Sequence, residues 1–189
     1  MTTQKGFTLI ELLIVIAIIG AITALVLLAI NPAKIIEDTN YKTTIANLNQ
    51  ISKAAQMYEA ETGKIPPDAN RNIPTEFMQY LGPGIWPNGP FDGSVYDWDN
   101  WLDNRGCWDG THGGVQITLR DIKSYKGVKY SYTIPNPTNP SARELINVNG
   151  QPELAIYMVV YGNGIPHCSI AQTVGICINC ESTHPPPNP

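Results

Sequence analysis

The chain has 189 residues and a formal net charge of -4, and 43% of its residues are hydrophobic. This composition is sufficient for one packed domain plus an appendage. The acidic balance argues against broad, non-specific binding to nucleic acid, which requires a basic face, but it leaves room for a small basic patch. Many of the apolar residues form one continuous block near the N-terminus, and the remainder has the composition of an ordinary soluble sequence.

The apolar block covers residues 7–30 and contains a single charged residue, Glu11. As an α-helix it would be about 36 Å long, enough to cross a hydrocarbon core of about 30 Å. The block is longer than the apolar region of a cleaved secretory signal, and no small-x-small cleavage site follows it, which favours a membrane anchor. Lys5 precedes the block. The positive-inside tendency therefore predicts residues 1–6 in the cytoplasm and the rest of the chain outside.

Glu11 is the feature that a plain anchor does not explain. A carboxylate inside the hydrocarbon costs about 3 kcal/mol or more unless it is paired or protonated. Nothing in the same helix is expected to pair with it, because Lys5 lies off the i, i+3 and i, i+4 spacings. Cleavage between Gly6 and Phe7 would create a new amine four residues before Glu11. Staggered helices in a fibre would then place one subunit's amine beside a neighbour's Glu11, so we expect this charge to set the assembly register.

A family resemblance lies in residues 5–20, which read KGFTLIELLIVIAIIG. This stretch resembles the class III signal of type IV pilins and of the pseudopilins of type II secretion and competence systems. The resemblance implies cleavage after Gly6 by an inner-membrane prepilin peptidase, N-methylation of Phe7, and a role for Glu11 in assembling a helical filament. It also implies a pilin-like α+β fold, in which a long N-terminal helix packs on a small antiparallel-sheet head.

The first proline of this chain lies four residues later than the proline that many members of that family carry. Many pilins carry a proline where this chain has Leu28, whereas here the proline is Pro32, which follows Asn31. Because proline removes a helical hydrogen bond and disfavours helix in the residue before it, we expect a kink or break near residues 29–31. Gly20 would permit local loosening of the helix in a fibre, or simply close helix packing.

After Pro32 the apolar residues recur at three- and four-residue steps through residues 41–58, which is typical of an amphipathic helix. Gly63, with two prolines shortly behind it, predicts the end of this helix. The expected domain boundaries are a cytoplasmic leader at 1–6, a transmembrane and assembly helix at 7–30, an amphipathic helix at 31–62, a globular head at 63–180, and a disordered proline-rich tail at 181–189.

Three segments of the head are predicted to be strands. Residues 115–120 alternate between apolar and polar, residues 128–134 are rich in tyrosine and β-branched residues, and residues 154–161 form an apolar run. Residues 75–81, which follow Pro74, are predicted to form a short helix. Strands laid on an amphipathic helix give an α+β architecture.

All four tryptophans lie within residues 86–108, interleaved with aspartates. The segment loosely resembles the calcium-binding loop of the major type II secretion pseudopilin, but it lacks the Asp-Pro-Trp-Gly order of that loop, and it does not fit an EF-hand. Two interpretations stay open. Either the tryptophans form a local apolar cluster while the aspartates cap turns, or Ca²⁺ binds at Asp92, Asp97, Asp99 and Asp103.

We expect disulfides among the cysteines, because thiols outside the cytoplasm tend to oxidise. The Cys177–Cys180 loop is short and strained, so Cys168 is expected to bond one of these two and Cys107 the other. A zinc knuckle that includes His167 and His184, or a redox-active Cys177-x-x-Cys180 pair, are the alternatives. The four cysteines concerned are Cys107, Cys168, Cys177 and Cys180.

The sequence contains no glycine-rich phosphate loop and no His-Glu-x-x-His pattern, and His112 lies in a glycine-rich turn, so an enzyme is not expected. We expect a homo-oligomeric structural subunit of a type IV pilus-like filament. It would be held in the cytoplasmic membrane and then polymerised by the pilus assembly machinery into an extracellular or periplasmic fibre.

Three alternatives differ in class. The first is a pseudopilin that acts as a short piston fibre in a type II secretion or competence system. The second is a binding subunit at a fibre tip, for adhesion or for DNA, although the net charge of -4 makes nucleic acid an unexpected partner. The third is an independent enzyme on a simple anchor. No cofactor other than the possible Ca²⁺ is expected.

Overall fold

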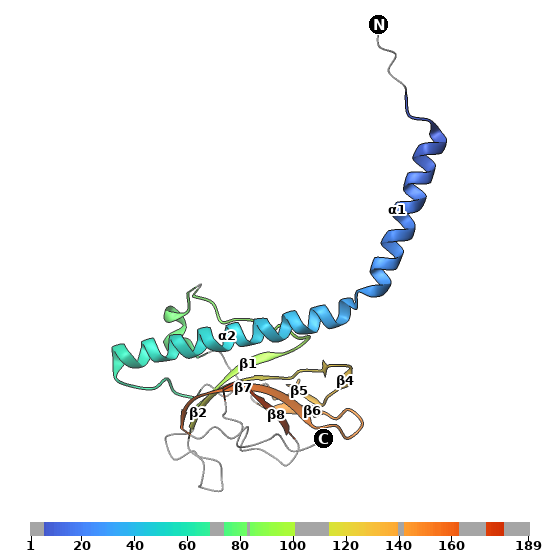
Figure 1. Ribbon diagram of the computed structural model, residues 1–189. Coiled ribbons are helices and arrows are strands. Elements are labelled where there is room, and N and C mark those ends of the chain that lie inside the picture. Colours follow the sequence, from blue (N-terminus) through green and yellow to red (C-terminus); the bar gives the residue numbers. More distant parts are fainter. Residues whose placement is uncertain are drawn as a thin grey trace. The chain divides into compact units, whose positions relative to one another are not determined.

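The computed structural model describes residues 6–68, 74–82, 84–100, 114–139, 142–162 and 173–179. The chain divides into two compact units, Met1–Asp38 and Thr39–Pro189. The first unit holds helix α1 (Leu9–Ala29) and the start of helix α2 (Pro32–Thr62), and the second unit holds the rest of α2 and every strand (Figure 1).

The apolar and amphipathic segments form two helices with a break at the predicted place. Ile30 closes α1 in an extended conformation, with φ -90° and ψ 123°. Pro32 opens α2 in the first helical position, where its missing N–H removes no hydrogen bond. Asn31 Oδ1 accepts a hydrogen bond from the Lys34 N–H at 3.2 Å and so caps the new helix. The expected interruption at residues 29–31 is confirmed.

Helix α2 supplies one wall of the head. Its buried residues within the second unit recur on one stripe, as the sequence period predicted. The helix ends at Thr62, and Gly63 follows with φ +68°, a left-handed conformation that favours glycine at this position. The buried residues of the helix are Thr44, Leu48, Ile51, Ala54 and Ala55.

A four-stranded sheet with the order β1-β2-β7-β8 forms the second wall. Strands β1, β2 and β7 pair antiparallel, whereas β8 lies parallel to β7, so the sheet is mixed and not purely antiparallel as expected. Two small hairpins and a 3-10 helix complete the head (Figure 1). The bounds are η1 Thr75–Tyr80, β1 Val95–Asn100, β2 Gly114–Arg120, β3 Ser124–Tyr125, β4 Val128–Lys129, β5 Tyr132–Pro135, β6 Arg143–Ile146, β7 Glu153–Gly162 and β8 Thr173–Cys177.

The strand predictions are partly confirmed. Segments 115–120 and 154–161 correspond to β2 and β7, but the single strand predicted at 128–134 is wrong. Ser131 divides it, because its N–H donates to Pro152 O at 3.1 Å and its hydroxyl donates to Gln151 O at 2.6 Å. The chain therefore changes partner at Ser131, from β3 before it to β6 after it.

One face of the sheet and the buried stripe of α2 share the hydrophobic core. Tyr96 and Trp98 of β1 stand opposite Leu119 and Ile117 of β2, and all four side chains are buried. The Trp98 ring lies 5.1 Å from that of Phe77 in η1, and its indole N–H donates to Pro66 O at 3.1 Å. Trp98 thus fills the core while its one polar group is satisfied.

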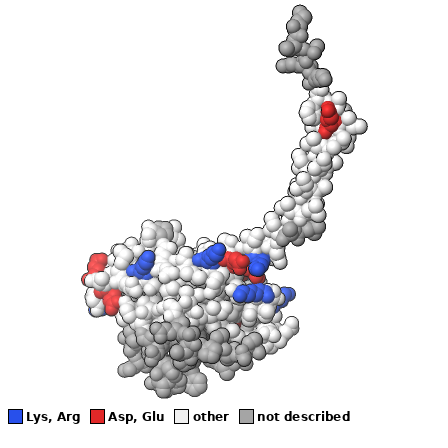
Figure 2. Space-filling view, in the orientation of Figure 1, with Lys and Arg blue, Asp and Glu red and all other residues white. Residues whose placement is uncertain are grey.

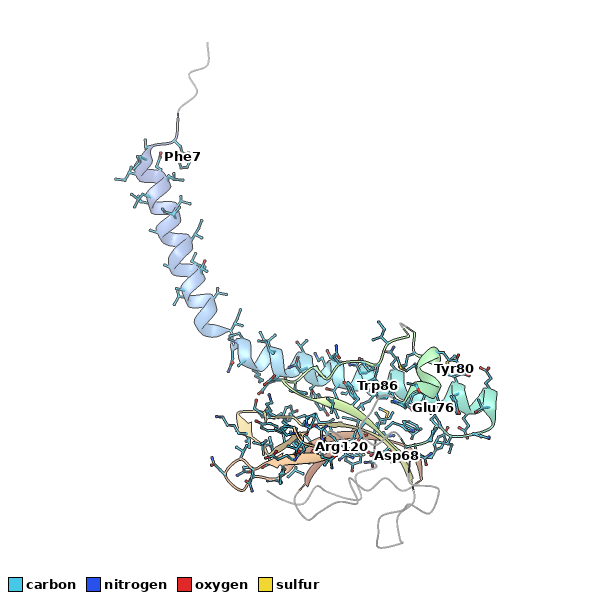
Figure 3. The ribbon with its side chains drawn as sticks, turned by 180° about the vertical axis from the view of Figure 1, so that it is seen from behind. Phe7, Asp68, Glu76, Tyr80, Trp86 and Arg120 are labelled. Carbon is cyan, nitrogen blue, oxygen red and sulfur yellow. The ribbon has the colours of Figure 1, made fainter. Side chains whose placement is uncertain are left out.

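The alternate residues of β1 and β2 bury charge instead. Arg120 is 2% exposed, with Nε 2.7 Å from Asp97 Oδ2 and Nη2 3.1 Å from Asp99 Oδ2. The Thr118 hydroxyl donates to the same oxygen of Asp99 at 2.9 Å. Burial alone would lower the pKa of Arg120, but the attraction of Asp99 and Asp97 outweighs it and raises the pKa. The guanidinium therefore stays charged inside the head, where Figure 3 labels it.

Hydrogen bonds from tyrosines tie α2 to the rest of the head. The Tyr161 hydroxyl at the end of β7 donates to Glu59 Oε2, and the Tyr80 hydroxyl of η1 donates to Glu61 Oε2 at 2.7 Å. Burial and the neighbouring Glu59 carboxylate raise the pKa of Tyr161 to about 12. Both contacts require the neutral phenol, since only the phenol carries a proton to donate.

Replacing Arg120 by methionine is expected to lower the free energy of unfolding by about 3–5 kcal/mol, because two buried carboxylates lose their cation. Denaturant unfolding of the detergent-solubilised chain, followed by tryptophan fluorescence, measures this change. The matched control is Lys123→Met, which removes an exposed pair with Asp92 and should cost less than about 1 kcal/mol. Equal losses in the two variants would contradict the importance of the buried cluster.

Alkaline pH is expected to weaken the head through Tyr161. An unfolded tyrosine titrates near pH 10, and the folded pKa is about 12. The contribution is therefore fully present below about pH 10 and is lost as the pH rises towards 12. In Tyr161→Phe the decline in melting temperature between pH 9 and pH 12 should be shallower than in the wild type. After solvent screening the difference should be at most about 1 kcal/mol.

Melting curves recorded at one-unit steps of pH provide the comparison. Tyr41→Phe serves as the control, because this ring packs against Tyr125 within the head and, among the described residues, forms no hydrogen bond with a carboxylate. Parallel declines for the wild type and Tyr161→Phe would show that the Glu59 contact does not matter for stability.

Candidate functional site

The residues around the predicted cleavage point precede α1 and are not helical. Gly6 and Phe7 are exposed, and no other side chain or backbone lies within 4 Å of where a Cβ on Gly6 would stand. Phe7, labelled in Figure 3, is 78% exposed. An exposed, non-helical peptide bond between these residues is open to a peptidase, while cleavage and methylation themselves stay predictions.

Glu11 has partners in its own chain, which corrects the expectation that nothing in the helix pairs with it. The backbone N–H and the hydroxyl of Thr8 donate to Glu11 Oε2 at 2.9 and 2.7 Å, and the Glu11 N–H donates to Thr8 Oγ1 at 3.3 Å. This reciprocal arrangement is a capping box at the start of α1. Its signal, Thr8-x-x-Glu11 before an apolar run, is present in the sequence and was missed. The donors from Thr8 are neutral, so they satisfy one oxygen without cancelling the charge.

Helix α1 presents apolar side chains on all sides. In Figure 2 it is uncoloured apart from one red patch, which is Glu11. Residues Leu9–Val26 are long and apolar enough to cross a membrane, and none of this span is buried within the chain. A helix that is apolar all round must be covered by lipid or by other helices. Gly20 makes no contact that requires glycine within the described chain, so its expected role in assembly stays a prediction.

The aspartates proposed for calcium do not gather in the described residues. Asp97 and Asp99 lie in β1 against Arg120, and Asp92 is exposed and pairs with Lys123 Nζ at 2.8 Å. Asp103 lies outside the described residues. In the described ranges, no group of three or more His, Cys, Asp and Glu side chains is placed to hold a metal ion. Calcium binding stays a prediction that this arrangement does not favour.

The two tryptophans that the structure describes lie in the hydrophobic core. Trp86 and Trp98 are buried, and their rings lie 5.9 and 5.1 Å from the ring of Phe77. Trp101 and Trp108 lie outside the described residues. The missed signal is the alternation of aromatic and acidic residues through β1, a period-two pattern that marks a strand with one apolar face.

Among the cysteines, the structure describes only Cys177, at the end of β8, and it is disulfide-bonded. The other three cysteines, Cys107, Cys168 and Cys180, lie outside the described residues, as do His112, His167 and His184. The predicted pairing therefore stays a prediction.

Comparison with known proteins gives a match for the N-terminal segment alone. Residues 1–30 match the family model described as the prokaryotic N-terminal methylation motif. No curated protein and no solved structure matches the chain. The matched residues include Gly6, Phe7 and Glu11, with the capping box and most of α1. Residues 1–30 are thus a class III prepilin signal, which supports a type IV pilin-like or pseudopilin protein.

Proposed function

We propose that the chain is a structural subunit of a type IV pilus-like filament. One observation carries this proposal: a single carboxylate, Glu11, lies near the N-terminal end of a strongly apolar helix that is otherwise uncharged and is not buried by the described part of the chain. A membrane would cover the apolar side chains, but it would not neutralise the charge. Neighbouring copies of the same helix would cover the apolar side chains and also neutralise the charge, if each copy placed a cation beside Glu11 of its neighbour.

The geometry at the start of α1 supports a neighbour's amine as that cation. Both donors of Thr8 reach the same carboxylate oxygen, Oε2. Within the part of the chain that the structure describes, the other oxygen, Oε1, receives no donor. Cleavage after Gly6 would create an amine on Phe7, and this amine on a staggered neighbour could bond to Oε1. Thr8 would meanwhile hold the carboxylate in place.

The prepilin signal is the type processed by a prepilin peptidase, and proteins that carry it generally assemble and do not catalyse reactions. In the proposed cycle, the subunit waits in the cytoplasmic membrane with its head outside and then joins a fibre by apolar helix packing. A pilus and the short piston fibre of a secretion or competence system would use the same assembly step. The length of the fibres formed in the native host separates these two roles.

Glu11→Ala and Glu11→Gln are both expected to leave membrane insertion intact and to reduce filaments at least about tenfold, which corresponds to losing about 1.4 kcal/mol per subunit contact. Glutamine keeps an oxygen that accepts hydrogen bonds from Thr8 but lacks the charge, so it separates helix capping from charge neutralisation. Membrane fractionation and electron microscopy of sheared appendages measure the two effects.

Asp38→Ala is the matched control, because Asp38 is an exposed carboxylate of α2 outside the apolar span. It should assemble as the wild type does. Normal filaments from Glu11→Gln would show that charge neutralisation does not set the register. An uncleaved Met1 in assembled fibres, detected by mass spectrometry, would contradict the processing step.

A further inference from the structure

The first turns of α2 carry two exposed isoleucines. Ile35 is 54% exposed and Ile36 is 60% exposed, although both lie beyond the apolar span Leu9–Val26. Both belong to the first compact unit, Met1–Asp38, which also contains α1. Removing two isoleucine side chains from water is favourable, so a surface that covers them would stabilise this segment.

Apolar and charged side chains of these turns lie on opposite sides of the helix. Successive residues of an α-helix are about 100° apart around its axis, which places Pro32, Ile35 and Ile36 within one sector of about 100°. The charged residues of the same turns lie in a second sector on the opposite side. They are Lys34, Glu37 and Asp38. A helix segment divided in this way suits a boundary between an apolar phase and water.

A short connection holds these turns close to the end of the apolar helix. Helix α1 has 21 residues and is about 32 Å long, which matches a hydrocarbon core of about 30 Å. Only Ile30 and Asn31 separate α1 from α2, so the first Cα of α2 is at most about 11 Å from the last Cα of α1. Ile36 follows about 6 Å of helix later. The isoleucines can therefore reach the surface of a membrane that α1 crosses, and this bound uses the first unit alone.

The break between the helices lets the first turns of α2 lie along such a surface. Ile30 closes α1 with an extended backbone, and the Asn31 side chain caps α2. Because each helix ends at its own cap, α2 is not required to continue the axis of α1. A continuous helix would instead carry Ile36 about 10 Å beyond the end of α1, past a headgroup layer that is about 5–7 Å thick.

We propose that Ile35 and Ile36 insert into the boundary between lipid headgroups and acyl chains while the subunit is held in the membrane. The inference rests on the membrane-held form of the proposed function. Lipid is the occupant that the first unit favours, because the isoleucines closely follow an apolar span that lipid would already cover. The charged residues on the opposite side would stay in water. Insertion would fix the level of α1 in the membrane from its C-terminal end.

The test replaces single residues of the full chain by the photoreactive amino acid p-benzoylphenylalanine. Ile36 is compared with Lys34 and Asp38, which lie on the opposite side of the helix, one before and one after Ile36 along the axis. Each variant is reconstituted in phosphatidylcholine vesicles, irradiated and analysed by mass spectrometry. We expect at least about threefold more lipid adduct at Ile36 than at either flanking position, because only its side of the helix would face the acyl chains.

The same replacement at Ile22 is the control for the anchor, since this side chain is 56% exposed within the apolar span. Lipid adducts at Ile22, with equal or no adducts at the three positions of α2, would overturn the inference and leave the anchor intact. A steady decline from Lys34 through Ile36 to Asp38 would reflect depth alone and would also overturn it. Absence of adducts at Ile22 would overturn both the inference and the membrane-held form. Covalent dimers at Ile36 in place of lipid adducts would assign the isoleucines to a second copy of the chain.

Discussion

One unneutralised carboxylate on an apolar helix is the constraint on which the rest of the molecule depends. None of Leu9–Val26 is buried by the described part of the chain, and Glu11 is the only charge of α1. Thr8 satisfies one oxygen of Glu11 with neutral donors, which lowers the cost of burying the group without removing its charge. Lipid alone would cover the apolar side chains, whereas in the proposed fibre a neighbouring copy would also supply a cation. The same helix can therefore be stored in a membrane and still favour assembly.

The head also buries charged side chains, but their opposite charges come from the same chain. Asp97 and Asp99 come from β1, and Arg120 comes from the end of β2, so the antiparallel pairing brings the charges together. Their attraction keeps Arg120 protonated despite its burial. Here the compensating charge comes from the same chain, in contrast to Glu11. In the proposed filament, the N-terminal helix would therefore supply the charge that needs a partner, and the head would not.

Short sequence patterns correctly predicted the features of the fold that depend on neighbouring residues alone. The break before Pro32, the helix end at Gly63 and the strands β2 and β7 follow from backbone restrictions and from the periodicity of apolar residues. Strand β1 was missed because its aspartates suggested a loop; they are tolerated only because β2 places Arg120 beside them. Such pairing depends on strand register, which the sequence does not reveal. The split at Ser131 has the same origin, because its partners lie about twenty residues away.

The position of the helix break decides how anchor and head are joined. The boundary between the two compact units falls within α2, between Asp38 and Thr39, and not in a loop. A continuous helix is a stiffer connection than a flexible linker. The ladder of helical hydrogen bonds is interrupted earlier, at Ile30 and Asn31, so a bend costs less there than inside either helix. Because this interruption lies beyond Leu9–Val26, the span that is long and apolar enough to cross a membrane stays helical throughout, with its backbone groups paired within the helix.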